Sequence, residues 1–397
     1  MLASKSEAGC SDGFSPGEHR ATARLAAGCV GYRRSIREID GSAQPAVPHD
    51  VREILVVSLC AILSGADSWG AILVWGESKL DWLRWYVPLE RGIPSHDTLG
   101  RRFAALDPLE FETRFVRWMR GLCPVPADEV VAIDGKTVRG SRSANPHGIH
   151  VVLAWANQLG MLLGQVRTAD GSNEITAIPE LLDVLLLKGA IVTLDAMGCR
   201  RQIATHIVEA GRDYVLAVGN NLPTPLARMR HAREAVERVP HAYRDHATEH
   251  QEIDKDHGRI ETRRCIASDV LAYCEPDPDL WPGLRSIVMV EATREIGDTK
   301  TVERPYYVSS LPPDAARIAQ AVRAHWRIES RLHWVLDMAF GEDQCRVRVN
   351  NATQNFAILS RICPNLLKAD TTTKAGIKNR LLKASASDGY RAAVLRL

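Results

Sequence analysis

The strongest constraint on the fold of this chain is a change of hydrophobic periodicity near residue 124. From about residue 50 to residue 123 the apolar residues recur at helical spacing, and Ser95 or Asp97 is placed to cap a helix after a turn. After the linker CPVPADE, short β-branched runs follow in the order strand, strand, strand, helix, strand, helix, strand. This order predicts an α/β domain with a mixed sheet, preceded by an all-α N-terminal module.

The same patterning predicts the organisation of the whole chain. We expect a poorly ordered leader, because the N-terminal segment is rich in Ala, Gly, Ser and Arg and has no sustained periodicity. A second β-rich stretch and a long helix follow the α/β alternation. The predicted divisions are a leader (1–45), a helical module (46–124), an α/β domain (125–345) with a β-rich insertion (about 245–311), and a C-terminal helical tail (346–397).

Composition limits the classes of protein. Fifty Lys and Arg against 48 Asp and Glu give a net charge of +2, so any basic surface must be local. The nine cysteines form no C-x-x-C pair, which favours reduced thiols over a disulfide framework or a zinc site. The apolar segment ILVVSLCAIL is too short to span a bilayer, and the N-terminus lacks the order of a signal peptide. We expect a cytoplasmic protein without a membrane partner.

Two aspartates follow predicted strands of the α/β domain. Asp134 follows the apolar run VVAI, and Asp195 follows the run IVTL. If these strands are neighbours, both acids project from one edge of the sheet, where such sheets place their ligands. Each also has a local explanation, because Asp134 fits an Asp-Gly hairpin turn and Asp195 fits a helix cap.

A third acid lies within an amphipathic helix near the C-terminus. We expect Glu329 to fall on the apolar stripe of this helix and to be buried, so that it needs a cation or another ion-pair partner. An internal ion pair is the alternative to a metal-binding role. The expected stripe consists of Ile318, Val322, Trp326, Leu332, Leu336 and Phe340.

Other polar residues near this acid offer further ligand sets. His333 and Asp337 follow Glu329 at helical spacing, so Glu, His and Asp on one face resemble a transition-metal site. Glu342 and Asp343 lie just beyond the helix and are spare candidates for the third acid. Three carboxylates from two strand ends and a helix instead suit Mg²⁺ or Mn²⁺. Two such ions about 4 Å apart promote phosphoryl transfer, which indicates chemistry on nucleic acid.

Six segments in order resemble the DDE transposases of the H-repeat-associated, ISAs-type insertion sequences. The resemblance runs from about residue 45 to the end, and GIPSHDTLGRRFAALDPLEF resembles the helical N-terminal module of that family. It implies an RNase H-like catalytic domain, with Asp134 and Asp195 as the catalytic aspartates and Glu329 as the catalytic glutamate. The six segments are AIDGKTVRGS, GSNEITAIPELL, IVTLDAMGC, HGRIETRR, YYVSSL and HWRIESRLHWVLDMAFGED.

The resemblance also implies an activity and its partners. We expect Mg²⁺-dependent cleavage of double-stranded DNA at terminal inverted repeats, strand transfer into target DNA, two bound ions and a homodimer at synapsis. The alternatives are an RNase H-like nuclease without strand transfer and a weakened DNA-binding protein from a decayed element. The chain departs from the family at Gly219 and Leu222, where the family usually has Lys and Gln, and at Ser330, where it usually has Asn. It departs from the broader class at Val322, His325 and Leu336, where that class often has Tyr, Arg and Lys.

Several residues are candidates for DNA contact, and each has a structural alternative. Lys136 and Arg139 could reach phosphates or be solvated hairpin charges. Trp326, together with Trp334, could hold an unstacked base or pack in the core. The remaining candidates are Arg101 and Arg102 in a helix-turn-helix-like reader or a plain helical hairpin, and His257, Arg259 and Arg263 on a DNA-facing or merely polar strand face.

Overall fold

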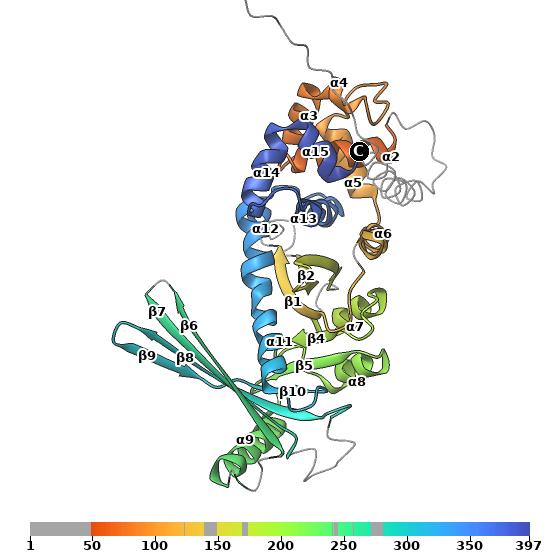
Figure 1. Ribbon diagram of the computed structural model, residues 1–397. Helices are drawn as coiled ribbons and strands as arrows, with labels where there is room; N and C mark the ends of the chain where they lie inside the picture. The colour runs from red at the N-terminus through yellow and green to blue at the C-terminus, as the bar shows by residue number, and fades with distance from the viewer. Residues whose placement is uncertain are drawn as a thin grey trace, which may run out of the picture.

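The protein is a mixed α/β structure built around one large sheet (Figure 1). The computed structural model describes residues 49–122, 124–138, 149–168, 174–239, 241, 245–256, 258–270 and 281–397. The predicted leader, Arg139 and His257 lie outside these residues. Within the described part of the chain, no helix combines the length and the apolar character needed to cross a membrane.

The sheet has ten strands, in the order β3-β2-β1-β4-β5-β10-β8-β7-β6, with β9 paired to β8. Strands β1, β4 and β5 are parallel to one another, and the remaining pairs are antiparallel. The predicted mixed sheet is therefore confirmed. The strands are β1 (Val130–Val138), β2 (Ile149–Ala156), β3 (Met161–Arg167), β4 (Ile191–Leu194), β5 (Asp213–Val218), β6 (Ala247–Asp256), β7 (Arg259–Ser268), β8 (Ser286–Ile296), β9 (Thr299–Glu303) and β10 (Tyr306–Ser309).

Helices cover both faces of the sheet, so alternate residues of its central strands are buried on opposite sides. On one face, α7 (Glu174–Val184) packs on β2 and β3, while α8 (Arg201–Glu209) packs on β5. On the other face, α11 (Ala315–Ile328) crosses β1, β4 and β5. It continues through a π-helical turn, η3 (Glu329–His333), into α12 (Trp334–Ala339). The long C-terminal helix predicted from the sequence is present.

A cluster of helices forms the opposite end of the molecule from β10 (Figure 1). Its hydrophobic core joins helices from both ends of the described chain, because α13 packs against α2, α5 and α6. Trp69 stacks on Phe103 and makes an edge contact with Phe356 of α13. The helices are α2 (Val51–Ile62), α3 (Trp69–Ser78), α4 (Leu80–Leu83), α5 (His96–Ala105), α6 (Pro108–Leu122), α13 (Ala352–Ala369), α14 (Ile377–Ala386) and α15 (Asp388–Leu395).

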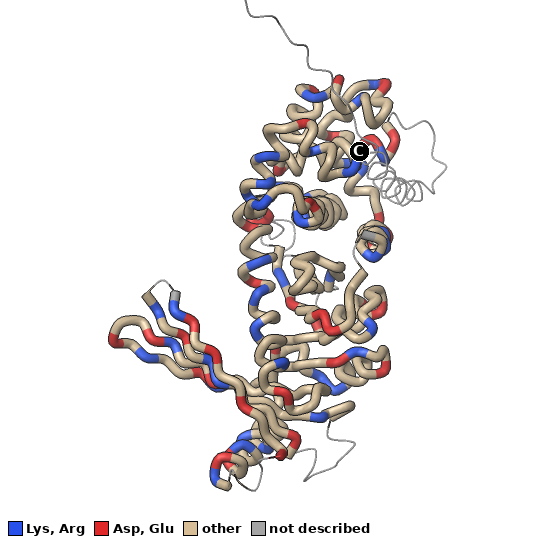
Figure 2. The backbone as a smooth tube through the Cα atoms, in the orientation of Figure 1, with Lys and Arg blue, Asp and Glu red and all other residues tan. Residues whose placement is uncertain are grey.

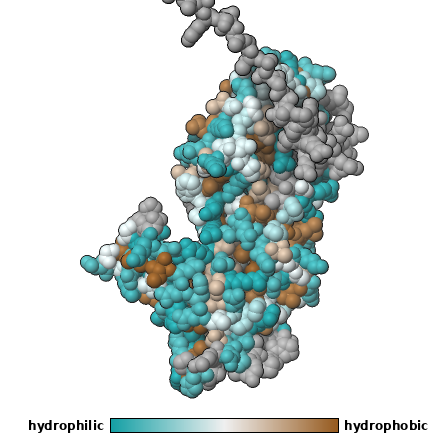
Figure 3. All heavy atoms as spheres, viewed as in Figure 1, coloured by the Kyte–Doolittle hydropathy of each residue, from teal (hydrophilic) through white to brown (hydrophobic). Residues whose placement is uncertain are grey.

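The β-rich segment predicted at 245–311 continues the main sheet, because β10 pairs with β5. Beyond it, β6 to β9 extend away from the body as an arm, while α9 (Pro223–Arg238) lies beside the base of the sheet (Figure 1). The arm strands carry both signs of charge (Figure 2). The register places exposed Ile253, Ile260 and Val302 on one face of the arm, where Figure 3 shows an apolar patch.

Asn355 tests how the C-terminal helix α13 is fixed to the N-terminal helices. Its amide is buried and donates hydrogen bonds to the carbonyls of Phe103 (2.7 Å) and Leu106 (3.0 Å) at the end of α5. Asn355→Ala leaves these acceptors without the amide, so the free energy of unfolding should fall by about 1–3 kcal/mol in urea titrations. Asn379→Ala is the matched control, because Asn379 is exposed, and it should leave the free energy of unfolding unchanged. Equal effects at the two sites would contradict this account.

Candidate metal centre

Asp134 and Asp195 lie side by side at neighbouring parallel strands. The register of β1 and β4 ends with Ile133 opposite Leu194, so the next residues are the two aspartates. Asp134 lies two residues after Ala132, and Asp195 lies two residues after Thr193. Thr193 faces α11, because its Oγ1 lies 3.0 Å from Nδ1 of His325 in that helix, and Ala132 faces the same side of the sheet. The strands therefore bring the two predicted acids to one face. Asp134 is not a turn residue, because β1 continues to Val138 and pairs Asp134 with Leu153.

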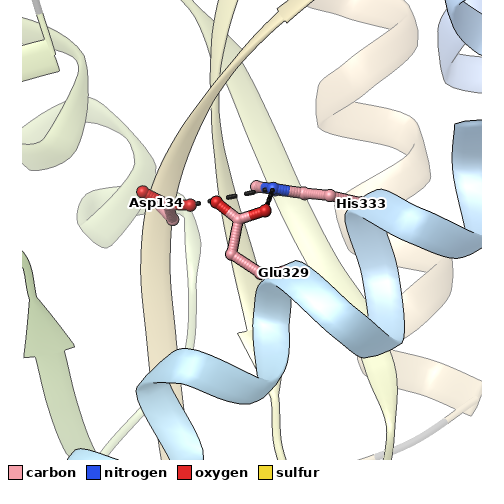
Figure 4. A group of neighbouring side chains, drawn as sticks. All are labelled: Asp134, Glu329 and His333. Carbon is pink, nitrogen blue, oxygen red and sulfur yellow. Dashed lines mark hydrogen bonds and ion pairs between the residues drawn. The ribbon is translucent and has the colours of Figure 1, made fainter. Parts of the chain in front are cut away.

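The π-helical turn brings Glu329 and His333 over Asp134 (Figure 4). His333 Nδ1 lies 3.2 Å from Glu329 Oε2 and 3.8 Å from Asp134 Oδ2. One ligand atom from each of the three residues falls within 4.8 Å of the others. A π turn adds one residue to the helix, and such turns are frequent at functional sites.

Asp195 lies outside this group of three in the described chain. Its Oδ1 accepts hydrogen bonds from the backbone N–H groups of Met197 (2.9 Å) and Gly198 (3.0 Å). The turn-capping alternative for Asp195 is thus realised, without removing it from the edge that it shares with Asp134. Its charge is one of the influences on the pKa of Asp134.

Hydrogen bonding indicates how His333 acts beside these acids. The ring is buried, which lowers its pKa and favours the neutral form. Its Nε2 is buried and has no hydrogen-bond partner among the described residues, whereas Nδ1 faces Glu329. We therefore assign the ring proton to Nδ1, which donates to the Glu329 carboxylate. In this state His333 holds Glu329 in place and leaves the oxygens of the acids as the available ligands.

The expected burial of Glu329 is wrong. Its side chain is 63% exposed, and Trp326, which we placed on the apolar stripe, is 62% exposed. The error arose from counting Trp326 as buried because it is apolar. The buried stripe shares Ile318, Val322, Leu332 and Leu336 with the expected one, but between Val322 and Leu332 it passes through His325 and Ile328. Glu329 lies at its edge, where a carboxylate can remain solvated.

The ligand set of Glu329, His333 and Asp337 is also not formed. Both Asp337 oxygens lie 2.9 Å from Lys136 Nζ, which directs this carboxylate away from Glu329. Glu342 is buried against Arg361 at 2.7 Å and is not available as a spare third acid. Lys136 is itself only 8% exposed, and its ammonium contacts protein acids. The interpretation of Lys136 as a solvated hairpin charge is therefore wrong, and its contact with a phosphate stays a prediction.

A second polar group lies behind Asp134, on the opposite face of β1. Glu174 Oε1 lies 2.7 Å from His150 Nε2, and His150 Nδ1 lies 3.0 Å from Thr137 Oγ1. A Cβ at Gly135 would lie 1.9 Å from Glu174 Oε1, so glycine is required for this approach. Neither Glu174 nor His150 was predicted from the sequence as a site residue. The only signal for Glu174 was its place within the segment GSNEITAIPELL.

The crowding of acids changes the ionisation of Asp134. Burial raises its pKa to about 7, and the nearby charges of Glu329, Glu174 and Asp195 contribute to the rise. A divalent cation would remove this penalty by binding the ionised form. Carboxylate oxygens from Asp134 and Glu329, with Asp195 beside them, are the donors that Mg²⁺ and Mn²⁺ prefer. The residues present therefore fit a hard divalent ion.

The remaining DNA-contact candidates have varied surroundings. Arg101 is exposed on α5, while Arg102 is partly buried and donates to the carbonyl of His49. Arg259 and Arg263 share one face of β7 and pair with Glu261, and Arg263 also binds Asp254. These pairs favour the alternative of a polar strand face for the two arm arginines.

The two tryptophans of the C-terminal helix are not in the core. Trp326 is 62% exposed and Trp334 is 57% exposed, on either side of Glu329 along the helix. The alternative that these two tryptophans pack in the core is therefore wrong. Exposed aromatic rings beside a carboxylate centre are available for stacking with planar ligand groups.

Gly135→Ala tests the close approach behind Asp134. The added Cβ must displace Glu174, so we expect the free energy of unfolding to fall by about 1–3 kcal/mol in denaturant titrations. Gly70→Ala is the matched control, because a Cβ there meets nothing within 4 Å. Adding Glu174→Ala to Gly135→Ala should recover part of the loss. A Gly135→Ala variant as stable as the control would contradict the clash.

Asp134→Asn tests the ionisation of the crowded acid without added metal. The folded pKa of about 7 exceeds the ordinary value of 3.8, so the folded state binds more protons between these values. The contribution of Asp134 to stability therefore falls as pH rises from about 4 to about 7. Asn cannot ionise, so the Tm advantage of the variant over the parent should grow across this range. A constant difference would contradict the raised pKa, and exposed Asp183→Asn serves as control.

Comparisons with known proteins support these observations. The family "Transposase DDE domain" matches residues 126–366, and the family "DDE_Tnp_1-associated" matches residues 40–119. YncI of Escherichia coli O157:H7, named as a transposase, is 39% identical over 362 residues, covering 89% of this chain and 90% of YncI. YhhI of Escherichia coli K12, named as an H repeat-associated transposase, is 37% identical over 355 residues, covering 88% and 93% respectively.

Among solved structures, a piggyBac transposase synaptic complex with hairpin DNA aligns with a TM-score of 0.41 and 11% identity. The alignment covers 91% of this chain and 77% of that one, and it is too remote to support an argument about individual residues. The family match and the two bacterial relatives are sufficient. This chain belongs to the DDE transposase family, with H repeat-associated transposases among its relatives.

Proposed function

We propose that this transposase uses Asp134, Asp195 and Glu329 to hold two Mg²⁺ or Mn²⁺ ions and to cleave DNA at the ends of an insertion sequence. The observation that carries the proposal is that Asp134 of β1 and Glu329 of the π-helical turn have ligand atoms within 4.8 Å of each other, while Asp195 directly follows the neighbouring strand β4. A local capping role explains the hydrogen bonds that Asp195 accepts, but it does not explain the close approach of Asp134 and Glu329.

The protein groups have distinct tasks in this proposal. Asp134 and Glu329 present carboxylate oxygens, and Asp195 supplies a third acid from the adjacent strand. His333 Nδ1 orients Glu329 by hydrogen bonding. When bound, two divalent ions stabilise charge on the attacking and leaving oxygens of a phosphodiester. In the first step water attacks the phosphodiester at the element end and its P–O3′ bond breaks, which gives a 3′-hydroxyl and a 5′-phosphate. In the second step this 3′-hydroxyl attacks a phosphodiester of target DNA, so that a new phosphodiester bond forms and a 3′-hydroxyl of the target strand leaves.

The catalytic domain is proposed to be RNase H-like. The strand order β3-β2-β1-β4-β5 supports this assignment, with acids at the junction of β1 and β4. The β-rich arm then corresponds to an insertion between the second and third acids. The helical cluster at the opposite end is proposed as the part that recognises terminal inverted repeats, with exposed Arg101 of α5 as one contact.

We propose double-stranded DNA as substrate, a homodimer in the complex that joins two ends, and action on the nucleoid in a bacterial cytoplasm. Trp326 and Trp334 support contact with an unstacked base near the reacting end, because both rings are exposed beside Glu329. Base stacking of this kind contributes affinity without requiring base-specific hydrogen bonds.

One observation bears on the alternative of a weakened DNA-binding protein. A Cβ at Gly219 would lie 2.9 Å from Ala196 Cβ, and Asn221 donates to the Ala196 carbonyl at 2.7 Å. The loop after β5 is thus closely fitted to the residue that follows Asp195. The lysine expected here from related transposases is replaced by a glycine that permits this contact. End binding without cleavage by the intact protein would select this alternative.

Asp134→Asn tests the catalytic proposal. The change removes one ionisable oxygen donor and keeps the shape of the side chain, so Mg²⁺-dependent nicking should fall about 100-fold or more, the order expected when a group that stabilises charge in the transition state is lost. The substrate is DNA carrying the inverted repeats that flank the gene. Gel-shift binding of the same DNA should be unchanged. Asp183→Asn, an exposed acid on α7, is the matched control.

The results of these assays distinguish a transposase from a nuclease and from a DNA-binding protein without cleavage activity. Unchanged nicking by Asp134→Asn would remove this acid from the mechanism. Equal cleavage of DNA with and without the repeats, and no strand transfer, would identify a nuclease. Cleavage restricted to the repeats, followed by joining to a target plasmid, would support the transposase.

A further inference from the structure

We propose that Lys136 is a positioning residue of the metal centre, tying the strand that carries Asp134 to the helix that carries Glu329 and His333. The inference rests on the proposed function of that centre and assigns a structural cause to its geometry. Lys136 itself contacts no reacting atom.

The contact joins the two elements directly beside the acids. Lys136 follows Asp134 by two residues, so both side chains leave β1 on the same face. Asp337 follows His333 by four residues and lies on α12. Lys136 Nζ lies 2.9 Å from each Asp337 oxygen, so the ammonium is held symmetrically by this carboxylate.

A buried network fixes Lys136 from behind. Glu342 Oε2 lies 3.8 Å from Nζ, and Glu342 Oε1 accepts from Arg361 Nε at 2.7 Å. Arg361 of α13 is fully buried and donates to Gln165 of β3 at 2.5 Å. The network therefore links the strand, the end of the long helix, α13 and the edge of the sheet. Burial raises the cost of separating these charges.

The contact between Lys136 and Asp337 is needed because the carboxylates of the metal centre repel each other. Asp134 and Glu329 place carboxylate oxygens within 4.8 Å of each other, and like charges at that distance repel. They are carried by separate elements, so repulsion favours movement of the η3–α12 helix away from β1. The attraction between Lys136 and Asp337 acts across the same two elements in the opposite direction. It keeps the acids close before an ion binds.

Mn²⁺ binding, followed by electron paramagnetic resonance on the full-length protein, tests the inference without depending on activity. Asp337→Asn and Lys136→Gln should each raise the Kd for Mn²⁺ by about 10-fold, the lower end expected for groups that support metal ligands. The double variant should lose no more affinity than either single variant, because each change removes the same tie.

Asp388→Asn is the matched control. Asp388 is a helical acid of similar exposure, 38% against 29% for Asp337, and it holds Lys79 and Arg391 in the helical cluster. Its replacement should leave the Kd for Mn²⁺ unchanged. If Lys136→Gln does not fold, Asp337→Asn alone provides the test. The Asp337 side chain is partly solvated, and circular dichroism can verify that the variant is folded.

The outcomes distinguish this inference from the proposed function. If the parent protein binds Mn²⁺ and folded Asp337→Asn binds it equally well, the positioning role is overturned while the metal centre remains. Additive losses in the double variant would also overturn it, because they show independent roles for the two residues. If the parent protein binds no Mn²⁺, the proposed function fails and this inference fails with it.

Discussion

The structure depends on holding several carboxylates close together against their mutual repulsion. The cost is visible at Asp134, since burial and the charges around it raise its pKa to about 7. The cost is tolerated because each acid is carried by an element packed elsewhere: β1 and β4 within the sheet, and the long helix across its face. Functional sites commonly lower the stability of the folded protein in this way, because the geometry that binds a ligand is not the most stable one without it.

The helices surrounding the sheet explain how this geometry is maintained. C-terminal α13 packs in one core with the N-terminal helices, and its Arg361 enters the network behind Lys136. The ends of the described chain thus meet on the side of the sheet that carries the candidate centre. The arm leaves the sheet at the other end and is connected to α11 through Arg323, which binds Glu252 and Asp254. The arm and the helical cluster therefore both contact the long helix in which Glu329 lies.

Sequence reasoning was successful where local pattern and tertiary structure agree. The runs before Asp134 and Asp195 were recognised as strands of a mixed sheet, and the structure meets the condition that these strands are neighbours. Reasoning failed for Trp326, whose apolar character suggested burial that the helix does not provide. It also failed for Lys136, because the partners Asp337 and Glu342 are about two hundred residues away in the chain. Charge and spacing alone gave no sign of that pairing.

The sequence by itself determined the order of strands and helices, the three candidate acids and the family resemblance, because these depend on residue type and local periodicity. Tertiary structure decided which side chains meet. It placed His333 against Glu329, directed Asp337 to Lys136 and set Glu174 behind Gly135. Such contacts depend on the phase of a helix across a sheet, and a single π turn is enough to change that phase, since one added residue rotates the following side chains by roughly 100°.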